Sequence, residues 1–362
     1  AAIKNIEISE FNPIETVDAN INGTINLIKM AKTWHDKELN LDSIKHETIS
    51  VIGYGIQGSA QASNLKDSGL NVIVGARRGG SSWQKALEDG HQVLEISEAV
   101  EQADIIHVLV PDMEQPKLYE EQIKPYLKDS NALGFSHGLV INYEWIKPPE
   151  WVDVIMVAPK APGRRVRELY LDNFGTPALI AVQQNYTNKA LDRALAIAKG
   201  LGCARAGLLQ TTFKEEVETD LFGEQANLCG GTASLIQNSF ETLVKSGYQP
   251  EVAYFECLHE LKLIVDLIQQ YGIKGMYNRV SETARYGGLT RGNRIINSAS
   301  RNEMEKILDE IKSGQFAEEW RQIYNKEGKH SFDKYLDKLS DHPIELAGKR
   351  LRFMMWPDKI IE

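Results

Sequence analysis

The fold of the first half of the chain is decided by the stretch Ile49-Ser-Val-Ile52-Gly53-Tyr54-Gly55-Ile-Gln57-Gly58. Residues 49–52 predict a strand, residues 59–67 a helix closed by Gly69, and residues 71–74 a second strand. This order is the one a dinucleotide-binding fold requires, with glycines at the tight turn, at the pyrophosphate and at the contact between helix and strand. We therefore expect the turn to bind a dinucleotide, the alternative being a turn whose glycines serve packing alone.

The end of the second strand indicates which dinucleotide is bound. An acid there would bond the ribose 2′-hydroxyl of NAD, whereas arginine accepts the 2′-phosphate of NADP. The sequence reads Gly75-Ala-Arg77-Arg78-Gly-Gly-Ser81-Ser82, without an acid. Two guanidiniums and two hydroxyls can surround a phosphate, since arginine offers paired donors to phosphate oxygens. NADPH is therefore favoured, and the alternative is a basic surface loop.

Strands and helices continue to alternate beyond this point. Helices are predicted over residues 83–89, around 99, over 115–126 and over 186–200, and strands around 93 and over 105–110, 132–135, 154–157 and 178–182. Such alternation is typical of a parallel sheet covered by helices on both faces. We therefore predict an α/β fold whose N-terminal domain is a Rossmann-type parallel sheet.

Open parallel sheets bind ligands at the carboxyl ends of their strands, and two loops there contain further candidate site residues. His137 lies in Ser136-His-Gly138, and Lys160 and Gly163 lie in Ala158-Pro-Lys-Ala-Pro-Gly163. Both loops follow strands directly, so His137 and Lys160 would overhang the cofactor cleft. By position alone, each is more often a structural residue than a functional one. His107 lies inside a strand and is interpreted as a core histidine.

The pattern changes after Thr212, where long helices replace the alternating units. Helices are predicted over residues 215–229, 232–246, 251–270, 301–312 and 343–355. The predicted organisation is an extension of unknown role (1–31), a Rossmann-type NADP-binding domain (32–212) and an all-helical domain (213–362). Ser281 begins a polar segment between these helices that could close over a metal site, or it caps a helix.

Two pairs of acids in the helical half have a spacing that suits a metal site. Within each pair the residues are four apart, on one face of a helix: Asp220 with Glu224, and Glu256 with Glu260. Two carboxylates about 4 Å apart repel by about 4 kcal/mol at an effective dielectric of about 20, so converging acids would be protonated or hold a cation. Oxygen ligands suit Mg²⁺ or Mn²⁺. The alternative is two acidic helix faces in solvent. The apolar run over residues 261–268 predicts that the second helix is mostly buried.

Length and composition restrict the class of protein. The chain has 362 residues, a net charge of −9 and a pI near 5.5, which argues for two domains and against nucleic acid or an anionic membrane as a partner. No segment reaches the roughly 18 to 20 apolar residues of a transmembrane helix, and the N-terminus lacks the layout of a signal peptide, so we expect a cytoplasmic protein. Cys203, Cys229 and Cys257 are expected to be reduced core residues.

Taken together, these motifs resemble those of the ketol-acid (acetohydroxyacid) reductoisomerases of branched-chain amino acid synthesis. The resemblance runs from about Trp34 to about Trp356. Its markers are Gly53-Tyr-Gly-Ile-Gln-Gly58, Gly134-Phe-Ser-His137-Gly138, Ala158-Pro-Lys160, Glu218-Thr-Asp220-Leu-Phe-Gly-Glu224-Gln225 and Tyr254-Phe-Glu256-Cys-Leu-His-Glu260-Leu-Lys262. Because the second acid pair occurs once and no internal repeat is present, the chain resembles the short form of the family.

The resemblance implies a site shared between subunits. Asp220 and Glu224 of one subunit, with Glu256 and Glu260 of the partner subunit, would hold two Mg²⁺ ions, with Asp220 bridging. The resemblance further implies roles for three residues: Ser281 at the substrate carboxylate, and His137 and Lys160 beside the nicotinamide. Our hypothesis for proton transfer is that a carboxylate or a metal-bound water near Glu260 handles the proton. The resemblance also implies a knotted all-α domain and at least a homodimer, with a larger assembly such as a dodecamer left open.

A reductoisomerase of this family converts 2-acetolactate, or 2-aceto-2-hydroxybutanoate, into a 2,3-dihydroxy acid by Mg²⁺-dependent alkyl migration followed by reduction with NADPH, or with NADH where it is accepted. Three features depart from the family pattern: Arg164-Arg165 follow the Lys160 loop, the loop after His137 lacks a second histidine, and residues 1–31 have no counterpart. The alternatives are a metal-free dehydrogenase that joins a Rossmann domain to a helical one, and a non-enzymatic nucleotide-binding scaffold. Neither alternative needs the four acids to converge.

Overall fold

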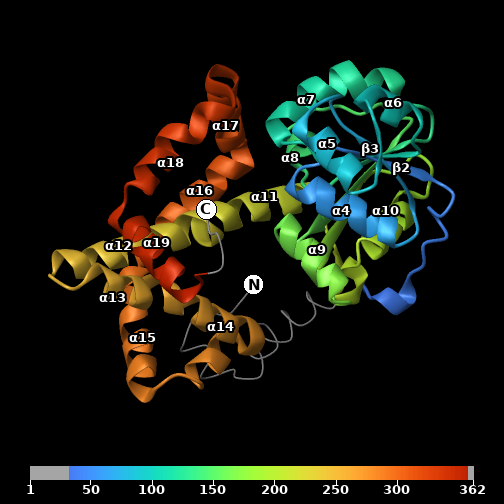
Figure 1. Cartoon of the computed structure of the whole chain (residues 1–362). Helices are drawn as coiled ribbons and strands as arrows, with labels where there is room; N and C mark the ends of the chain where they lie inside the picture. Colours follow the sequence, from blue (N-terminus) through green and yellow to red (C-terminus); the bar gives the residue numbers. More distant parts are fainter. Residues whose placement is uncertain (1–31, 358–362) are drawn as a thin grey trace, which may run out of the picture. The chain divides into compact units, whose positions relative to one another are not determined.

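A computed structural model describes residues 32–357, and the chain divides after Val217 into two compact units (Figure 1). The N-terminal unit is built around a sheet, and the helical unit follows it. The division falls inside helix α11 (Phe213–Gly223), whose first residue directly follows the boundary predicted from the sequence. The predicted extension over residues 1–31 lies outside the described residues.

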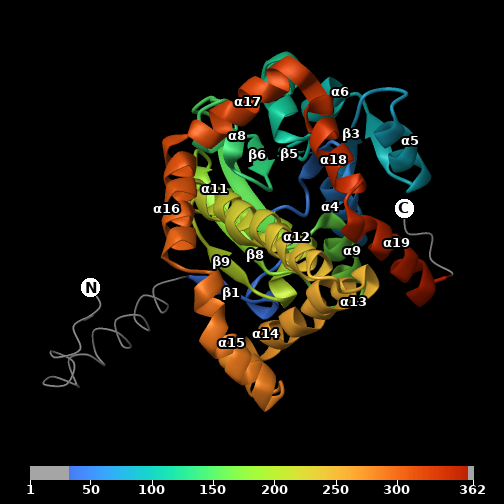
Figure 2. The ribbon, with the colours of Figure 1, turned by 90° about the vertical axis from the view of Figure 1, so that its left-hand side faces the viewer.

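The N-terminal unit contains a nine-stranded sheet in the order β1-β9-β8-β7-β6-β5-β2-β3-β4. Strands β1, β9, β8, β6, β5 and β3 of this sheet are labelled in Figure 2. Its strands are β1 (Thr33–Trp34), β2 (Thr48–Ile52), β3 (Asn71–Gly75), β4 (Gln92–Leu94), β5 (Ile105–Val108), β6 (Ala132–Phe135), β7 (Asp153–Pro159), β8 (Ala178–Gln184) and β9 (Leu208–Gln210). The strands from β4 through β3, β2, β5 and β6 to β7 run parallel, which confirms the predicted Rossmann-type unit.

The far end of the sheet departs from the predicted parallel arrangement. Strand β8 runs antiparallel to β7, and β1 runs antiparallel to β9. The loop after β8 therefore lies at the opposite edge of the sheet from the loops after β6 and β7. An apolar run contains no information about strand direction, so the sequence pattern alone could not predict this reversal.

Helices cover both faces of the sheet (Figure 1). Helix α4 (Ile56–Asp67) packs with α9 (Gly163–Leu171) and α10 (Ala190–Gly200) on one face, and α6 (Ile96–Glu101) packs with the π-helical turn η4 (Tyr119–Ile123) on the other. Helix α9 was not predicted from the sequence. The remaining helical segments are η2 (Asp36–Glu38), α5 (Ser81–Glu88), η3 (Asp112–Glu114), α7 (Gln115–Leu118), η5 (Lys124–Tyr126), α8 (Leu139–Asn142) and η6 (Cys203–Arg205).

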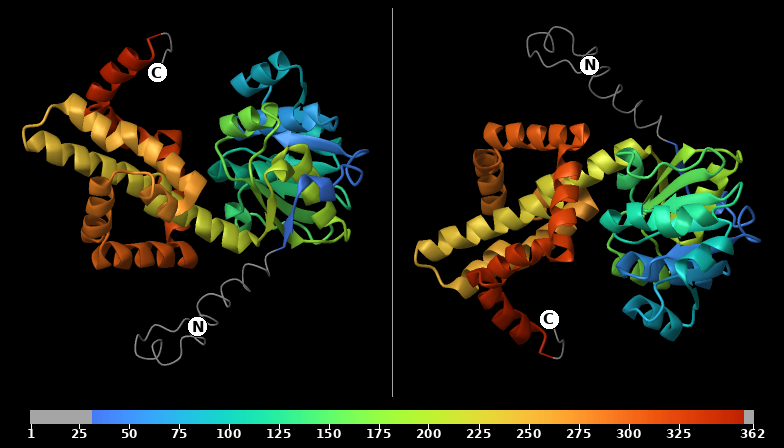
Figure 3. Two further views of the ribbon diagram at one scale, coloured as in Figure 1. Left: turned by 90° about the horizontal axis from the view of Figure 1, so that it is seen from below. Right: turned by 90° about the horizontal axis from the view of Figure 1, so that it is seen from above.

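The helical unit contains no strand among its described residues. Its segments after α11 are η7 (Glu224–Leu228), α12 (Gly230–Lys245), α13 (Pro250–Tyr254), η8 (Phe255–His259), α14 (Glu260–Tyr277), α15 (Glu282–Ile295), α16 (Ser298–Ser313), α17 (Gln315–Glu327), η9 (Gly328–Phe332), α18 (Asp333–Ser340) and α19 (Pro343–Met355). Helix α12 lies alongside α13 and η8 (Figure 3). A small core joins them to α19 through Phe240, Ala253, Tyr254, Ile344, Ala347 and Leu351.

Helix α14 is less buried than its sequence predicts. Leu263 is 54% exposed and Val265 is 50% exposed, so the prediction of a mostly buried helix is wrong for the single chain. An apolar pattern predicts that a face is covered but does not say which chain covers it.

No helix in the described part of the chain is long and apolar enough to cross a membrane. The three cysteines are free, but Cys229 is exposed and is therefore not a core residue.

Candidate active site

The glycine turn joins β2 to α4, and the helix begins at Ile56 rather than at Ser59. Gly53 has φ 98°, in the left-handed region that favours glycine. A Cβ on Gly58 would lie 2.1 Å from the Gly53 carbonyl oxygen, so a larger residue there would push the helix off the turn. Gly55 differs, because no atom of residues 32–357 outside the adjoining stretch of chain lies within 4 Å of the position that a Cβ would take. The space in front of Gly55 is therefore available to a ligand.

The loop that follows β7 is fastened to this turn. A Cβ on Gly163 would lie 2.3 Å from the Ile56 carbonyl oxygen, so α9 and α4 can begin side by side only because Gly163 has no side chain. Gln57 Nε2 donates to the Ala161 carbonyl oxygen at 3.0 Å. The predicted residues Gln57 and Gly163 thus hold the Lys160 loop against the glycine turn.

The side chains of Tyr54 in the glycine turn and of Arg164 and Arg165 after the Lys160 loop interact with protein groups. Tyr54 is 2% exposed, and its hydroxyl donates to Asp89 Oδ2 at 2.8 Å. Burial, the largest cause, raises the pKa of this hydroxyl. Arg164 and Arg165 pair with the two carboxylate oxygens of Glu168 at 3.0 and 3.2 Å. The Tyr54 side chain therefore anchors the turn, leaving its backbone to meet a ligand.

Arg77 and Arg78 have different surroundings. Arg78 Nε pairs with Glu95 Oε1 at 3.1 Å, and its guanidinium lies 5.8 Å from the centre of the Trp83 ring. Arg77 bends over Gly80, where its Nε lies 3.8 Å from the position of a Cβ, and it has no ion-pair partner within residues 32–357. The sequence shows no acid in this loop, but Glu95 reaches it from the end of the neighbouring strand β4.

Ser81 and Ser82 form the first turn of α5 rather than part of an extended loop. Gly80 is the residue that precedes this helix, and its N–H donates to the Arg77 carbonyl oxygen at 3.0 Å. The first turn of a helix presents unpaired N–H groups that favour an anion. Arg77 therefore lies beside a helix start and two hydroxyls, which is a suitable set of donors for a phosphate.

A buried carboxylate that the sequence analysis missed lies at the other end of this edge. Glu216 of α11 is 1% exposed, and its Oε1 accepts from Lys160 Nζ at 2.8 Å, while its Oε2 lies 3.1 Å from His137 Nδ1. The Gly138 N–H also donates to Oε2 at 3.4 Å. The sequence does contain a signal for Glu216. It lies four residues before Asp220, and residues four apart share one face of a helix.

The charge of Glu216 is maintained by its partners. Burial, the largest single cause, raises the pKa of its carboxyl, but the hydrogen bonds and charges of His137 and Lys160 together outweigh it and leave that pKa below its usual value. Glu216 is therefore ionised at neutral pH. The structure brings His137 and Lys160 together on this one carboxylate, although they lie in different loops.

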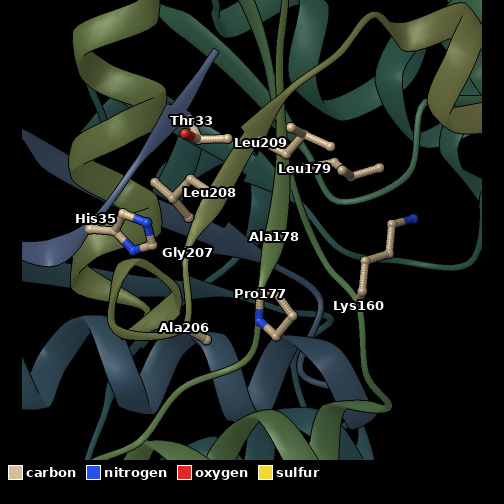
Figure 4. A pocket seen from close by; sticks show the side chains of 10 residues that line it. All are labelled: Thr33, His35, Lys160, Pro177, Ala178, Leu179, Ala206, Gly207, Leu208 and Leu209. Carbon is tan, nitrogen blue, oxygen red and sulfur yellow. The ribbon is translucent and has the colours of Figure 1, made fainter. Parts of the chain in front are cut away.

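The Lys160 side chain also borders an apolar pocket of about 330 Å³. The ten lining residues are Thr33, His35, Lys160, Pro177, Ala178, Leu179, Ala206, Gly207, Leu208 and Leu209. In Figure 4 the Lys160 ammonium group points away from His35, which lies on the opposite side of the pocket. His35 and Lys160 therefore do not form a pair there.

The predicted metal acids lie next to irregular helical turns. Asp220 belongs to α11 and Glu224 begins the π-helical turn η7, whereas Glu256 lies in the π-helical turn η8 and Glu260 begins α14. Turns of this kind are rare inside helices and frequently mark functional sites. Each pair lies on its own helical segment. Ser281 is the N-cap of α15, where its hydroxyl oxygen accepts from the Ala284 N–H at 3.1 Å.

Comparison with known proteins identifies the family of the chain. Residues 43–207 match the model "Acetohydroxy acid isomeroreductase, NADPH-binding domain", and residues 213–356 match "Ketol-acid reductoisomerase, C-terminal domain". A ketol-acid reductoisomerase (NADP(+)) of Nitrosopumilus maritimus is 61% identical over 329 residues, which cover 91% of this chain and 99% of the relative. One of Methanopyrus kandleri is 56% identical over 326 residues, covering 90% and 99%.

A solved structure agrees with these relatives. An NADH-preferring ketol-acid reductoisomerase from an uncultured archean superimposes with a TM-score of 0.86 at 47% identity, covering 89% of this chain and 98% of that one. Family models, curated relatives and a solved structure therefore lead to the same assignment over nearly the whole described chain. The chain belongs to the ketol-acid reductoisomerase family.

Proposed function

We propose that the chain is an NADPH-dependent ketol-acid reductoisomerase that converts 2-acetolactate or 2-aceto-2-hydroxybutanoate into the 2,3-dihydroxy acid, in valine and isoleucine biosynthesis. The observation that carries the proposal is the ionised, buried Glu216, which gathers His137 and Lys160 at the carboxyl edge of the sheet. A scaffold that only bound a nucleotide would have no need of a buried anion holding two basic side chains there.

The glycine turn and its surroundings fit NADPH. Gly55 leaves open space for a pyrophosphate, and Arg77 beside the start of α5 offers donors to a 2′-phosphate. The matching family model is described as NADPH-binding, although one solved relative prefers NADH. When bound, the cofactor supplies a hydride to a keto group. We assign the choice between NADPH and NADH chiefly to Arg77, because Arg78 is paired with Glu95.

The four predicted metal acids fit Mg²⁺ by donor chemistry, because all of them offer carboxylate oxygens and none offers nitrogen or sulfur. Asp220 and Glu224 would supply one half of the ligand set, and Glu256 and Glu260 of the partner subunit the other. Two Mg²⁺ ions held in this way would stabilise negative charge on the substrate oxygens.

The protein groups at the sheet edge have separate tasks in this proposal. Glu216 fixes the Lys160 ammonium group, which can donate a hydrogen bond to a substrate oxygen. By accepting from His137 Nδ1, Glu216 keeps a proton on that nitrogen and so orients the ring. The Ser281 hydroxyl can donate its proton to the substrate carboxylate while its oxygen caps α15. Glu260 is proposed to carry the proton released and taken up during turnover.

We also propose that the enzyme is at least a homodimer, with a larger assembly such as a dodecamer as a further step. The half-exposed Leu263 and Val265 lie on α14, the helix that begins with Glu260. A partner subunit that covered these apolar side chains would bring the second acid pair to a neighbouring site. A cytoplasmic location remains a prediction.

The test of the metal proposal is Asp220→Asn. This change should abolish Mg²⁺-dependent isomerisation, because an amide is a neutral and weaker ligand, while NADPH binding measured by fluorescence titration should stay within about twofold. The matched control is Glu215→Gln, which removes the same charge from an exposed position of α11. Isomerisation that survives Asp220→Asn, or is lost equally in Glu215→Gln, would refute the assignment of Asp220.

A further inference from the structure

A buried amide, Gln61, connects the segments that form the sheet edge. Gln61 lies in α4 and is fully buried. Its Oε1 lies 2.8 Å from His107 Nε2, and its Nε2 donates to Ser136 Oγ at 3.0 Å and to Gln57 Oε1 at 3.1 Å. Gln57 in turn donates to the Ala161 carbonyl oxygen at 3.0 Å. One hydrogen-bonded chain therefore runs from the centre of the sheet to both loops of the site.

The direction of this chain is fixed by His107. Burial lowers the pKa of His107 to about 4, so its ring is neutral at physiological pH. His107 Nδ1 has no hydrogen-bond partner among the described residues and lies against Gly134, where a Cβ would be 2.6 Å away. The ring proton therefore lies on Nε2 and is donated to Gln61 Oε1, which turns the Gln61 amide nitrogen toward Ser136 and Gln57.

We propose that Gln61 is a positioning residue for catalysis, an inference that rests on the proposed function. Ser136 directly precedes His137, and Ala161 directly follows Lys160. By holding both loops and Gln57 of the glycine turn, Gln61 sets the two basic side chains relative to the cofactor without touching any ligand. A misplacement of reacting groups by about 1 Å can lower a rate by about a hundredfold.

A second buried amide in the same sheet allows a matched comparison. Asn131 is 4% exposed, and its Nδ2 donates to the Ala103 and Asp104 carbonyl oxygens at 3.0 and 3.2 Å. It lies just before β6, whereas Ser136 lies just after that strand. Asn131 is therefore a buried, hydrogen-bonded amide at the amino ends of the parallel strands, the edge of the sheet opposite the site. Its loss should affect folding alone.

The test uses Gln61→Met, Gln61→Glu and Asn131→Leu in the full-length protein, with thermal unfolding, NADPH titration and turnover of 2-acetolactate with Mg²⁺. Gln61→Met should lower kcat at least about tenfold while KM changes less than about threefold. Gln61→Glu should keep more activity than Gln61→Met, because a buried carboxyl stays protonated and its O–H can donate to Ser136. Asn131→Leu should lower the Tm but leave kcat within about twofold.

A double variant of Gln61 and Ser136 gives a second test, because a loss of folding stability alone would not make the effects of the two changes on activity depend on each other. If Gln61 acts through this residue, Gln61→Met/Ser136→Ala should lose no more activity than the worse single variant. The proposal is wrong if Gln61→Met keeps its kcat, if Gln61→Glu is no better than Gln61→Met, or if Asn131→Leu loses as much kcat. If Gln61→Met does not fold, the comparison of Gln61→Glu with wild type and Asn131→Leu decides. A wild-type protein without Mg²⁺-dependent turnover would instead refute the proposed function.

Discussion

Arg77 and Arg78 are adjacent in the sequence but contact different groups, so replacing each of them should have unequal effects on NADPH binding. Arg78 already pairs with Glu95, whereas Arg77 lies beside Gly80 at the start of α5. A charge-assisted hydrogen bond contributes roughly 1.5 to 3 kcal/mol, or about one to two powers of ten in affinity. Arg77→Asp should therefore weaken NADPH binding at least about tenfold, while NADH binding should change little or improve.

Arg78→Asp is the matched variant, since it makes the same charge change one residue away. Its effect on the preference for NADPH over NADH should be smaller, because the guanidinium it removes is held by an acid. The Michaelis constants for both cofactors in both variants give the answer. An equal shift in both variants would contradict the assignment of the preference chiefly to Arg77, and no shift in Arg77→Asp would show that Arg77 does not bind the phosphate.

The sequence could indicate a candidate site residue where its own loop suggests a role. It could not indicate contacts between residues that lie far apart in the chain. The sequence singled out His137 and Lys160 as candidates from their loops, but it did not show that both meet one carboxylate, because Glu216 comes from a helix distant in the sequence. Glu95 was missed for the same reason, since it reaches Arg78 from the position between β4 and α6. The charge pattern of a loop describes only the charges that the loop itself contributes.

Two glycines at the starts of α4 and α9, Gly55 and Gly163, should respond differently to replacement by alanine. Gly163→Ala places a Cβ 2.3 Å from the Ile56 carbonyl oxygen, so the helices must separate and the free energy of unfolding should fall by about 1 to 3 kcal/mol. Gly55→Ala meets no atom of the described residues within 4 Å apart from the adjoining chain, so the Tm should hardly change. NADPH binding should nevertheless weaken, because the new methyl group fills the space that faces the pyrophosphate.

Thermal unfolding and NADPH fluorescence titration of the two variants separate these effects. An unchanged NADPH affinity in Gly55→Ala would mean that the pyrophosphate does not approach this glycine. Unchanged stability in Gly163→Ala would mean that α9 can move away from α4 at little cost.

Elements were predicted from the sequence most accurately where their pattern is simple. The compact β-branched runs of β2 and β3 lie where the sequence placed them, and so does the tight turn at Gly53. The start of α4 did not, because residues 56–58 were assigned to the turn although their backbone already belongs to the helix. The π-helical turns η7 and η8 were also missed, since they arise from one extra residue per turn and leave no change in composition.

The exposed apolar side chains of α14 lead to a prediction about sites that two subunits share. If Glu256 and Glu260 complete the site of the partner subunit, inactive Asp220→Asn and Glu260→Gln proteins should regain activity when they are mixed and reassembled. Each mixed dimer would contain one site free of both changes, so about a quarter of wild-type activity is expected for random exchange. Exchange itself is checked by native mass spectrometry.

Self-mixing of each variant under the same conditions is the control and should give no recovery. No recovery in the heterologous mixture, with exchange demonstrated, would show that each chain builds its own metal site.

The overall division into a sheet unit and a helical unit was predictable, because the period of the apolar pattern changes near residue 212. Intersubunit completion and the knot that the family resemblance implies stay predictions, since neither leaves a mark on the pattern of one chain.

We propose that this chain couples a Mg²⁺-dependent rearrangement to reduction by NADPH, and one assay can decide whether it does. Oxidation of NADPH is followed at 340 nm with 2-acetolactate, with Mg²⁺ and after removal of divalent cations with EDTA, and the product is identified by mass spectrometry. We predict that NADPH is consumed only when both substrate and Mg²⁺ are present, with 2,3-dihydroxy-3-methylbutanoate formed in equal amount. NADPH oxidation that continues unchanged without divalent cations, or no reaction with 2-acetolactate at all, would contradict the claim.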